Sequence, residues 1–268
     1  MKFSVLISVY YKESPEFLDK ALESVLINQT LKPSELVLVA DGLLTDGLYS
    51  TIEKYQSLFP HFKLVQLSQN LGLGKALNEG IKHCSYEWIA RMDSDDISAL
   101  DRFEKQFAYI ASHPEIDVLG TALSEFETSP TDILTVKKCP QNIDSYIKLR
   151  SPLNHPTVIY KKSAVMSAGG YVHCPFMEDY HLWIRMYSEG AIMTSLQDSL
   201  YLFKMDSETI RRRGGWQYVQ SEYQIQKLLL SRNIISIPRF IVNTAIRCSV
   251  RIIPPKFRAF IYKTFLRK

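Results

Sequence analysis

The sequence predicts an α/β protein whose first half is Rossmann-like, with parallel strands covered by helices on both faces. Two observations lead to this prediction. Short runs rich in Val, Ile and Leu alternate with amphipathic helical segments through residues 1–100, an order typical of a parallel sheet. Polar residues, many of them acidic, directly follow each apolar run, at the positions where open α/β sheets bind ligands.

The elements of this half can be placed one by one. Phe3–Val9 is a mostly apolar run and predicts a buried strand. Ser14 and Pro15 then supply an N-cap and a proline at the first helical position. The helix that follows has one apolar face, made of Phe17, Leu18, Ala21, Leu22, Val25 and Leu26. The further predicted elements are the strand Leu36–Ala40, the helix Asp46–Phe59, the strand Phe62–Leu67, the helix Leu73–His83 and the strand Glu87–Arg91.

Composition narrows the class of protein. The 268 residues are 46% hydrophobic and 22% charged, which excludes a disordered chain. The cysteines are far apart and form no CxxC pair, which favours a reducing compartment. The apolar run at the N-terminus is too short for the core of a signal peptide, so the sequence predicts a cytoplasmic protein.

The charge is unevenly distributed along the chain. Residues 232–268 hold nine Lys or Arg and no acid, whereas 23 basic and 28 acidic residues precede them. Apolar residues alternate with these basic ones, and no uncharged run approaches the ~18–20 residues of a membrane span. We therefore expect amphipathic helices on an anionic membrane surface and no nucleic-acid partner. A helix pair packed on the body, with an ordinary basic face, is the alternative.

The strongest chemical signal is the segment Arg91–Asp96, which carries three carboxylates within four residues at the end of a predicted strand. Clustered carboxylates repel one another, and a divalent cation placed between them and a second anion relieves the repulsion. Mg²⁺ or Mn²⁺ prefers oxygen ligands and leaves coordination positions for phosphates. Asp93 and Asp95 are therefore candidate metal ligands. Alternatively, a side chain of this turn caps the helix expected over Asp101–Ile110.

Two further segments are less specific. Asp41–Gly42 follows the second strand, and an isolated Asp-Gly pair favours a plain turn over a ligand site. The segment Asn70–Lys75 places two glycines and a lysine at a predicted helix N-terminus, which suits a phosphate. Its spacing matches neither the P-loop nor the GxGxxG fingerprint.

Taken in order, these segments resemble the family 2 glycosyltransferases, which have the GT-A fold. The similar stretches read SVLISVYYKE, ESVLINQTLKPSELVLVADG, NLGLGKALNEGI and IARMDSDDISALDRFEKQ. The resemblance covers residues 3–107 and extends more loosely to residue 225. It implies a Rossmann-like nucleotide-sugar-binding half with a mixed central sheet (1–115), an acceptor-binding and catalytic half (116–231) and a C-terminal amphipathic membrane-association segment (232–268).

The resemblance also implies roles for individual residues on the donor side. The implied uracil and ribose contacts are Tyr10, Glu13 and Asp41. The implied contacts to phosphate or sugar are Asn70, Lys75, Asp93 and Ser94, and the implied metal ligands are Asp95 and Asp93, holding Mn²⁺ or Mg²⁺. Because negative charge builds on the leaving diphosphate, Arg212 and Arg213 are expected to pair with it, but they could equally be a solvated basic loop. One departure concerns the Asp-Gly turn, where the family often has a second acid and a serine but this chain has Ala40 and Leu43.

On the acceptor side, the segment Phe176–Trp183 resembles the family's ED segment, whose aspartate is the catalytic base. An inverting transfer needs a carboxylate that removes the proton of the attacking hydroxyl, and Asp179 is the residue that matches. Glu178, His155 and Trp183 are expected at the acceptor. The alternatives are an exposed helical acid or an N-terminal helix cap for Asp179, a structural histidine for His155 and a core side chain for Trp183.

The expected function is single-sugar transfer. The resemblance implies a UDP-linked glucose, galactose or N-acetylated hexose as donor and a lipid-diphosphate-linked sugar, such as undecaprenyl-diphosphate-GlcNAc or -GalNAc, as acceptor, in O-antigen or exopolysaccharide synthesis at the cytoplasmic face of the inner membrane. Processive relatives carry a QxxRW motif, which is absent here. A nucleotidyltransferase would have a glycine-rich loop after the first strand, and Tyr10–Glu13 lacks glycine. A non-catalytic membrane-associated nucleotide-binding protein is the other alternative, against which the intact acids argue.

Overall fold

The computed structural model describes residues 1–205 and 215–252. Within them the strands are β1 (Phe3–Val9), β2 (Glu35–Ala40), β3 (Phe62–Gln66), β4 (Trp88–Asp93), β5 (Ile97–Ser98), β6 (Val118–Phe126), β7 (Ile133–Lys137), β8 (Ile159–Lys161) and β9 (Met193–Lys204). The helices are α1 (Pro15–Leu26), α2 (Asp46–Leu58), α3 (Leu73–His83), α4 (Arg102–Ser112), α5 (Ile143–Tyr146), the short 3-10 helix η1 (His155–Thr157), α6 (Lys162–Ser167), α7 (Glu178–Ser188), α9 (Trp216–Ser231) and α10 (Ile237–Ile252).

The described strands form one mixed sheet in the order β3-β2-β1-β4-β8-β6-β9-β5, with β7 paired to β6. The first four strands of this order are parallel, as the sequence predicts. β4 extends two residues beyond its predicted end at Arg91, because Asp93 pairs with Ser8 of β1. The first acid of the cluster is therefore the last residue of a strand.

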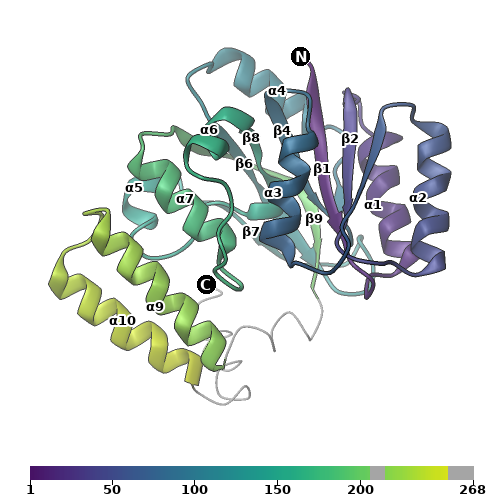
Figure 1. The fold of residues 1–268 in the computed structure, drawn as a ribbon. Helices are drawn as coiled ribbons and strands as arrows, with labels where there is room; N and C mark the ends of the chain where they lie inside the picture. Colours follow the sequence, from purple (N-terminus) through teal and green to yellow (C-terminus); the bar gives the residue numbers. More distant parts are fainter. Residues whose placement is uncertain (206–214, 253–268) are drawn as a thin grey trace.

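Helices cover both faces of the sheet (Figure 1). Alternate residues of β1 point to opposite faces, because successive side chains of a strand do so. Val5 and Ile7 pack with α1, α2 and α4, whereas Leu6 packs with α3 in a core that also includes residues of α7 and α9. These two apolar layers fix the sheet and hence the edge at which its strands end.

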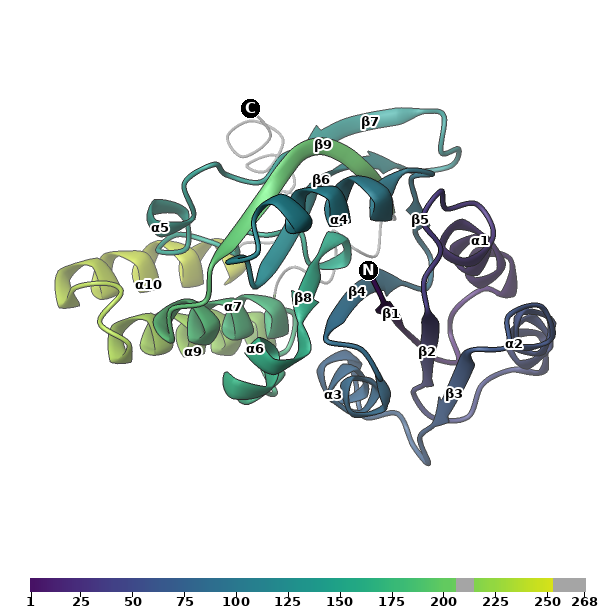
Figure 2. The same ribbon diagram turned by 90° about the horizontal axis from the view of Figure 1, so that it is seen from above.

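The second half of the chain departs from the parallel pattern. β8 pairs antiparallel with both β4 and β6, while β6 and β9 run parallel to each other. The predicted mixed central sheet is thus confirmed. A long β9 crosses this part of the molecule, and Figure 2 shows its strong bend.

Two C-terminal helices, α9 and α10, lie side by side at the end of the molecule opposite to α1 and α2 (Figures 1 and 2). The boundary predicted after residue 231 coincides with the end of α9. On α10 the exposed apolar side chains are Ile237, Ile241, Val242 and Ile246. None of the helices in the two described ranges combines the length and apolar character that crossing a bilayer requires.

Candidate active site

The strands β1 and β4 end side by side at the point where the chain order of the sheet reverses. β2 and β3 lie on one side of β1, and β4 lies on the other. Crevices at such switch points are where open α/β sheets bind ligands. Here the segments after the two strands are joined, because Ser94 Oγ donates a hydrogen bond to Glu13 Oε2 at 3.0 Å. Glu13 Oε1 also accepts the Ser14 backbone N–H at 2.8 Å.

The acidic turn after β4 contains three carboxylates in different environments. Asp93 forms a two-pronged ion pair with the buried Arg91, whose Nη1 lies 2.8 Å from Asp93 Oδ2. Asp96 is buried, and its Oδ1 accepts the backbone N–H of Lys204 at 2.7 Å. Burial, together with the charges of Asp93 and Glu13, raises the pKa of Asp95 to about 7. Burial and the charges of Asp95 and Asp93 raise the pKa of Asp96 well above its usual value, so Asp95 and Asp96 are the two acids whose negative charges are compensated less than that of Asp93.

The alternative role of this turn, as a helix cap, is wrong. The next helix, α4, begins at Arg102 with Asp101 in the cap position, and the short strand β5 separates it from the acids. The turn is therefore available for a ligand.

The donor set of the turn suits a divalent cation. Three like charges, those of Asp95, Asp93 and Glu13, act on one another at the end of the sheet, and a cation would relieve that repulsion. The described residues hold no group of three or more His, Cys, Asp or Glu side chains arranged as a complete metal cage. Mg²⁺ is usually held by one or two carboxylates, with substrate phosphates and water as its other ligands, so this incomplete set fits an ion that binds together with a diphosphate.

Asp41 organises the loop that precedes α3. Its two carboxylate oxygens accept the backbone N–H groups of Leu71 and Gly72 at 2.7 and 3.0 Å. Gly42 has φ +90°, and a Cβ there would lie 2.8 Å from the Asn70 backbone nitrogen, so the turn and the loop approach too closely for any side chain. Asp41 therefore fixes the loop, as well as lying at the predicted nucleoside edge.

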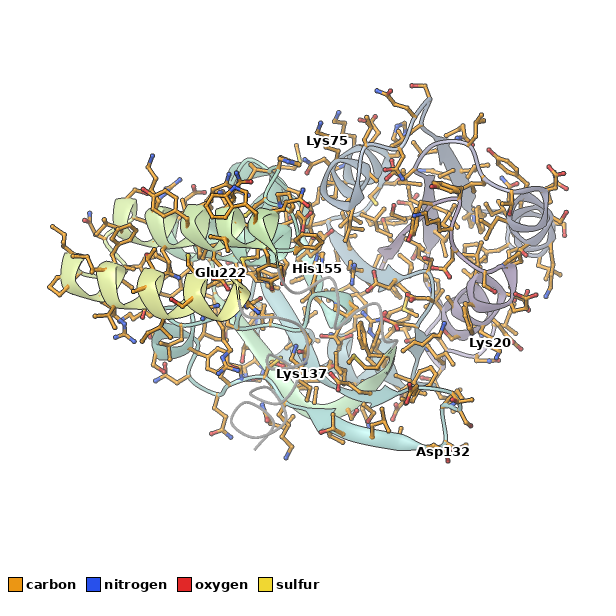
Figure 3. The ribbon with its side chains drawn as sticks, turned by 90° about the horizontal axis from the view of Figure 1, so that it is seen from below. Lys20, Lys75, Asp132, Lys137, His155 and Glu222 are labelled. Atoms are coloured by element: carbon orange, nitrogen blue, oxygen red, sulfur yellow. The ribbon has the colours of Figure 1, made fainter. Side chains whose placement is uncertain are left out.

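The remaining predicted donor residues lie at the surface. Tyr10 is 37% exposed and its ring lies 5.9 Å from that of Tyr11. Asn70 and Lys75 are exposed, and Figure 3 labels Lys75 on α3. Arg212 and Arg213 lie outside the described residues.

Asp179 and Glu178 occupy the first turn of α7. Ser151 Oγ donates to Asp179 Oδ2 at 3.0 Å. Burial raises the pKa of Asp179, while the charges of Lys137 and Arg91 oppose the rise. Burial likewise raises the pKa of Glu178 to about 7. The alternative of an exposed helical acid is wrong, since Asp179 is half-buried.

The donor loop and the ED segment are in contact. A Cβ added at Gly74, in the first turn of α3, would lie 3.2 Å from Glu178 Cγ and 3.4 Å from Tyr171 Cβ. One turn later, the Asn78 side chain donates to the Tyr171 carbonyl at 2.6 Å and accepts its N–H at 2.7 Å. α3 therefore carries the Asp41-bound loop at its start and holds the segment before α7 along its side.

His155 is half-buried, and Trp183 proves to be an interior residue. His155 Nε2 lies 2.8 Å from the Tyr171 hydroxyl, and burial, with Arg91 nearby, lowers the pKa of His155 well below its usual value. The imidazole is thus neutral. Trp183 has no exposed surface, and its ring centroid lies 6.0 Å from that of His155. Trp183 packs in the core and cannot stack on an acceptor in this conformation, which corrects the expectation that it does.

Sequence reasoning assigned no role to three residues of this site. Arg91 had a signal, because a charged residue two positions before Asp93 on a buried strand shares its face of the sheet. Ser151 and Tyr171 had none, because their neighbours in the fold, Asp179 and Asn78, are distant in sequence.

Comparison with known proteins places the chain in a class. The model of glycosyl transferase family 2 matches residues 4–167, and the chain belongs to this family. It is therefore a glycosyltransferase, and the fold expected from the sequence is confirmed.

Particular relatives match over nearly the whole chain. The amylovoran biosynthesis glycosyltransferase AmsE of Erwinia amylovora is 40% identical, over 97% of this chain and 98% of its own. The UDP-Gal:alpha-D-GlcNAc-diphosphoundecaprenol beta-1,3-galactosyltransferase of Escherichia coli is 38% identical, over 100% and 97%. Among solved structures, S. aureus TarS 1-349 in complex with UDP-GlcNAc superposes with a TM-score of 0.71 at 21% identity, over 99% of this chain and 77% of that one, which supports the GT-A fold.

Proposed function

We propose that the protein moves one hexose, with inversion, from a UDP-sugar to a lipid-diphosphate-linked sugar in bacterial polysaccharide synthesis. Two relatives support this substrate class, since one is named for UDP-Gal transfer to diphosphoundecaprenol-linked GlcNAc and the other for amylovoran biosynthesis. The observation that carries the proposal is the contact between Gly74 and Glu178, because it brings the donor loop beside the acid pair of α7.

In this proposal Asp179 is the general base. Its carboxylate accepts the proton of the acceptor hydroxyl as that oxygen attacks the anomeric carbon from the side opposite UDP. The base must be ionised, and the positive charges of Arg91 and Lys137 favour that form against the effect of burial. Ser151 donates to one carboxylate oxygen, which orients the group and leaves the other oxygen for the substrate.

On the donor side, Asp95 would hold Mn²⁺ or Mg²⁺, with Asp93 as second ligand. The ion would neutralise the charge that develops on the departing diphosphate. Arg91 keeps Asp93 in a fixed orientation through its two-pronged pair. Glu13 and Asp41 lie at the edge where the nucleoside is expected, beside the exposed Tyr10.

We also propose peripheral attachment to the cytoplasmic face of the inner membrane through α10. Ile237, Ile241, Val242 and Ile246 form an exposed apolar stripe on this helix, and the chain beyond residue 231 is basic. Such a helix can lie in the headgroup region. In vesicle sedimentation we expect binding to anionic but weaker binding to neutral vesicles. The double variant Ile241→Asp/Ile246→Asp should reduce binding at least tenfold, and unchanged binding would refute the surface.

The substrates are tested by a donor and acceptor screen. The protein is incubated with Mn²⁺ or Mg²⁺, a panel of UDP-, GDP- and dTDP-sugars and a GlcNAc-diphosphate-lipid analogue, and the product's anomeric configuration is read by NMR. We expect turnover with a UDP-hexose, inversion and loss of activity with a chelator. Preferential use of a GDP- or dTDP-sugar, or retention of configuration, would contradict the proposal.

A further inference from the structure

Phe176 has an unusual backbone conformation just before the ED segment. Its φ is +68°, in the left-handed region that a bulky residue adopts only when its surroundings enforce it. Its ring is stacked on that of Tyr218 in α9, with centroids 5.5 Å apart and planes 12° apart. Since Glu178 is only two residues further on, the strained position and the acid pair of α7 belong to one short segment.

Tyr218 is itself anchored by α10. The Arg251 guanidinium lies 4.2 Å from the centroid of the Tyr218 ring, a distance at which cation–π attraction is effective. Arg251 also pairs with Glu222 of α9 at 2.9 Å, and Arg247 pairs with the same carboxylate at 2.8 Å. Glu222 is fully buried and is labelled in Figure 3, so this anchor is an interior ion-pair network and not a surface contact.

We infer that α9 and α10 position the catalytic base, because Tyr218, held by Arg251 and Glu222, anchors the Phe176 ring and the turn that carries it, and so fixes the start of α7. This inference rests on the proposed role of Asp179. We call this group the Phe176 clamp; its members are Phe176, Tyr218, Arg251 and Glu222. Tyr218 and Arg251 are positioning residues. Tyr218 contacts Phe176, and Arg251 contacts Tyr218 and Glu222, whereas neither contacts the reacting atoms.

Other contacts secure the same segment and define what the clamp adds. The backbone N–H of Met177 bonds to the Cys174 carbonyl at 2.9 Å, and the Cys174 thiol lies 4.0 Å from the Ser221 carbonyl of α9. The Met177–Cys174 bond closes a turn with Pro175 and Phe176 at its centre, and a type II turn, with proline first, requires a positive φ at its second central residue. The turn therefore sets the φ of Phe176, and the ring stack adds the contact that anchors the turn to α9.

The pH dependence of catalysis reports on the clamp. The charged or titratable groups that act on Asp179 or feel its charge are Arg91, Lys137, Tyr171, Cys174, Glu178 and Tyr180. Burial is the largest cause of the raised pKa of both Asp179 and Glu178. Phe176 is itself 43% exposed, so the clamp acts by holding the start of α7 in place. Without it this helix start would loosen and admit water to the acid pair, and the acid limb of the kcat/KM profile would move to lower pH.

The test uses the full chain, the UDP-hexose identified as donor and a water-soluble GlcNAc-diphosphate acceptor. Tyr218→Leu removes the ring, Tyr218→Phe restores it, and Tyr223→Leu is the matched control on the same helix. Tyr223 is 49% exposed and contacts Phe240 edge-to-face. We expect Tyr218→Leu to lower kcat at least tenfold, with the donor KM within twofold of wild type and the acid limb shifted down. Tyr218→Phe and Tyr223→Leu should stay within twofold.

A second variant guards against misfolding. In Phe176→Gly the ring is lost, but glycine adopts a positive φ without strain, so the fold is preserved and kcat should fall with the same shift of the limb. An unshifted limb in both Tyr218→Leu and Phe176→Gly, whatever their kcat, would overturn the inference. Full activity of Asp179→Asn would instead refute the proposed base, which separates the two failures.

Discussion

The two halves of the site are built by different physical means. On the donor side, parallel strands bring acids to one edge: the carboxylates of Glu13, Asp41 and Asp95 all follow strands of the parallel part of the mixed sheet. On the acceptor side, Asp179 is placed by the start of a helix and by Ser151, which comes from a distant loop. The first half of the site is thus a property of the sheet, and the second half depends on long-range contacts. Mutations should affect the two halves in different ways.

The largest effect should come from removing the base. Asp179→Asn keeps the size of the side chain and its contact with Ser151 but removes its basicity, so kcat should fall by about 10²–10⁴-fold. The donor KM should change little, because Asp179 lies on the acceptor side. Steady-state kinetics with the UDP-hexose would show this, and a mutant with wild-type kcat would exclude Asp179 as base.

Removing the donor-side acid should weaken catalysis and yet stabilise the metal-free protein. Asp95→Asn should lower activity on the order of 10²-fold, since the ion would lose a ligand. The native pKa of Asp95 is raised to about 7, so the folded state binds more protons than the unfolded state between about pH 4 and 7, and its stability falls as pH rises through that window. In the metal-free protein, Asp95→Asn removes this pH-dependent loss of stability, so the variant should melt a few degrees higher than wild type at pH 8. A lower melting temperature would contradict the assignment.

Two glycines test how closely the turn at Gly42 approaches the loop that precedes α3. Gly42 and Gly190 have nearly equal φ values of +90° and +87°, but a Cβ at Gly42 would lie 2.8 Å from the Asn70 nitrogen, whereas Gly190 has nothing within 4 Å. Gly42→Ala should therefore cost about 1–3 kcal/mol more than Gly190→Ala in urea unfolding. It should also raise the donor KM, which Gly190→Ala should not. Equal losses of unfolding free energy in the two variants would show that the loop bound by Asp41 moves to make room for the added methyl group.

The smallest predicted effect concerns Lys137. Its charge lowers the pKa of Asp179, so Lys137→Met should move the acid limb of the kcat/KM profile to higher pH, by less than about one unit because Lys137 is exposed and solvent screens it. The shift should shrink in high salt. A limb that moves to lower pH would reverse the assigned sign.

Local patterns predicted the parallel half well, because each of its strands and helices has its own apolar periodicity and is bounded by turn or capping residues. The helix Leu73–His83 and the strand Phe3–Val9 have the bounds expected from the sequence. Trp183 shows where such reasoning stops: it belongs to the ED segment, yet the packing of α7 buries it completely. The contact between Phe176 and Tyr218 had no sequence signal, since their meeting depends on how α9 packs.

The division of labour between the two halves can be measured directly by titrating UDP with Mn²⁺ into the variants in a calorimeter. The account predicts that Asp179→Asn binds UDP within twofold of wild type although its turnover is lost, and that Asp95→Asn binds at least tenfold more weakly. Equally weakened UDP binding in both variants, or undiminished UDP binding in Asp95→Asn, would contradict the account. It holds that the edge of the sheet binds the donor and that the start of α7 supplies the catalytic base.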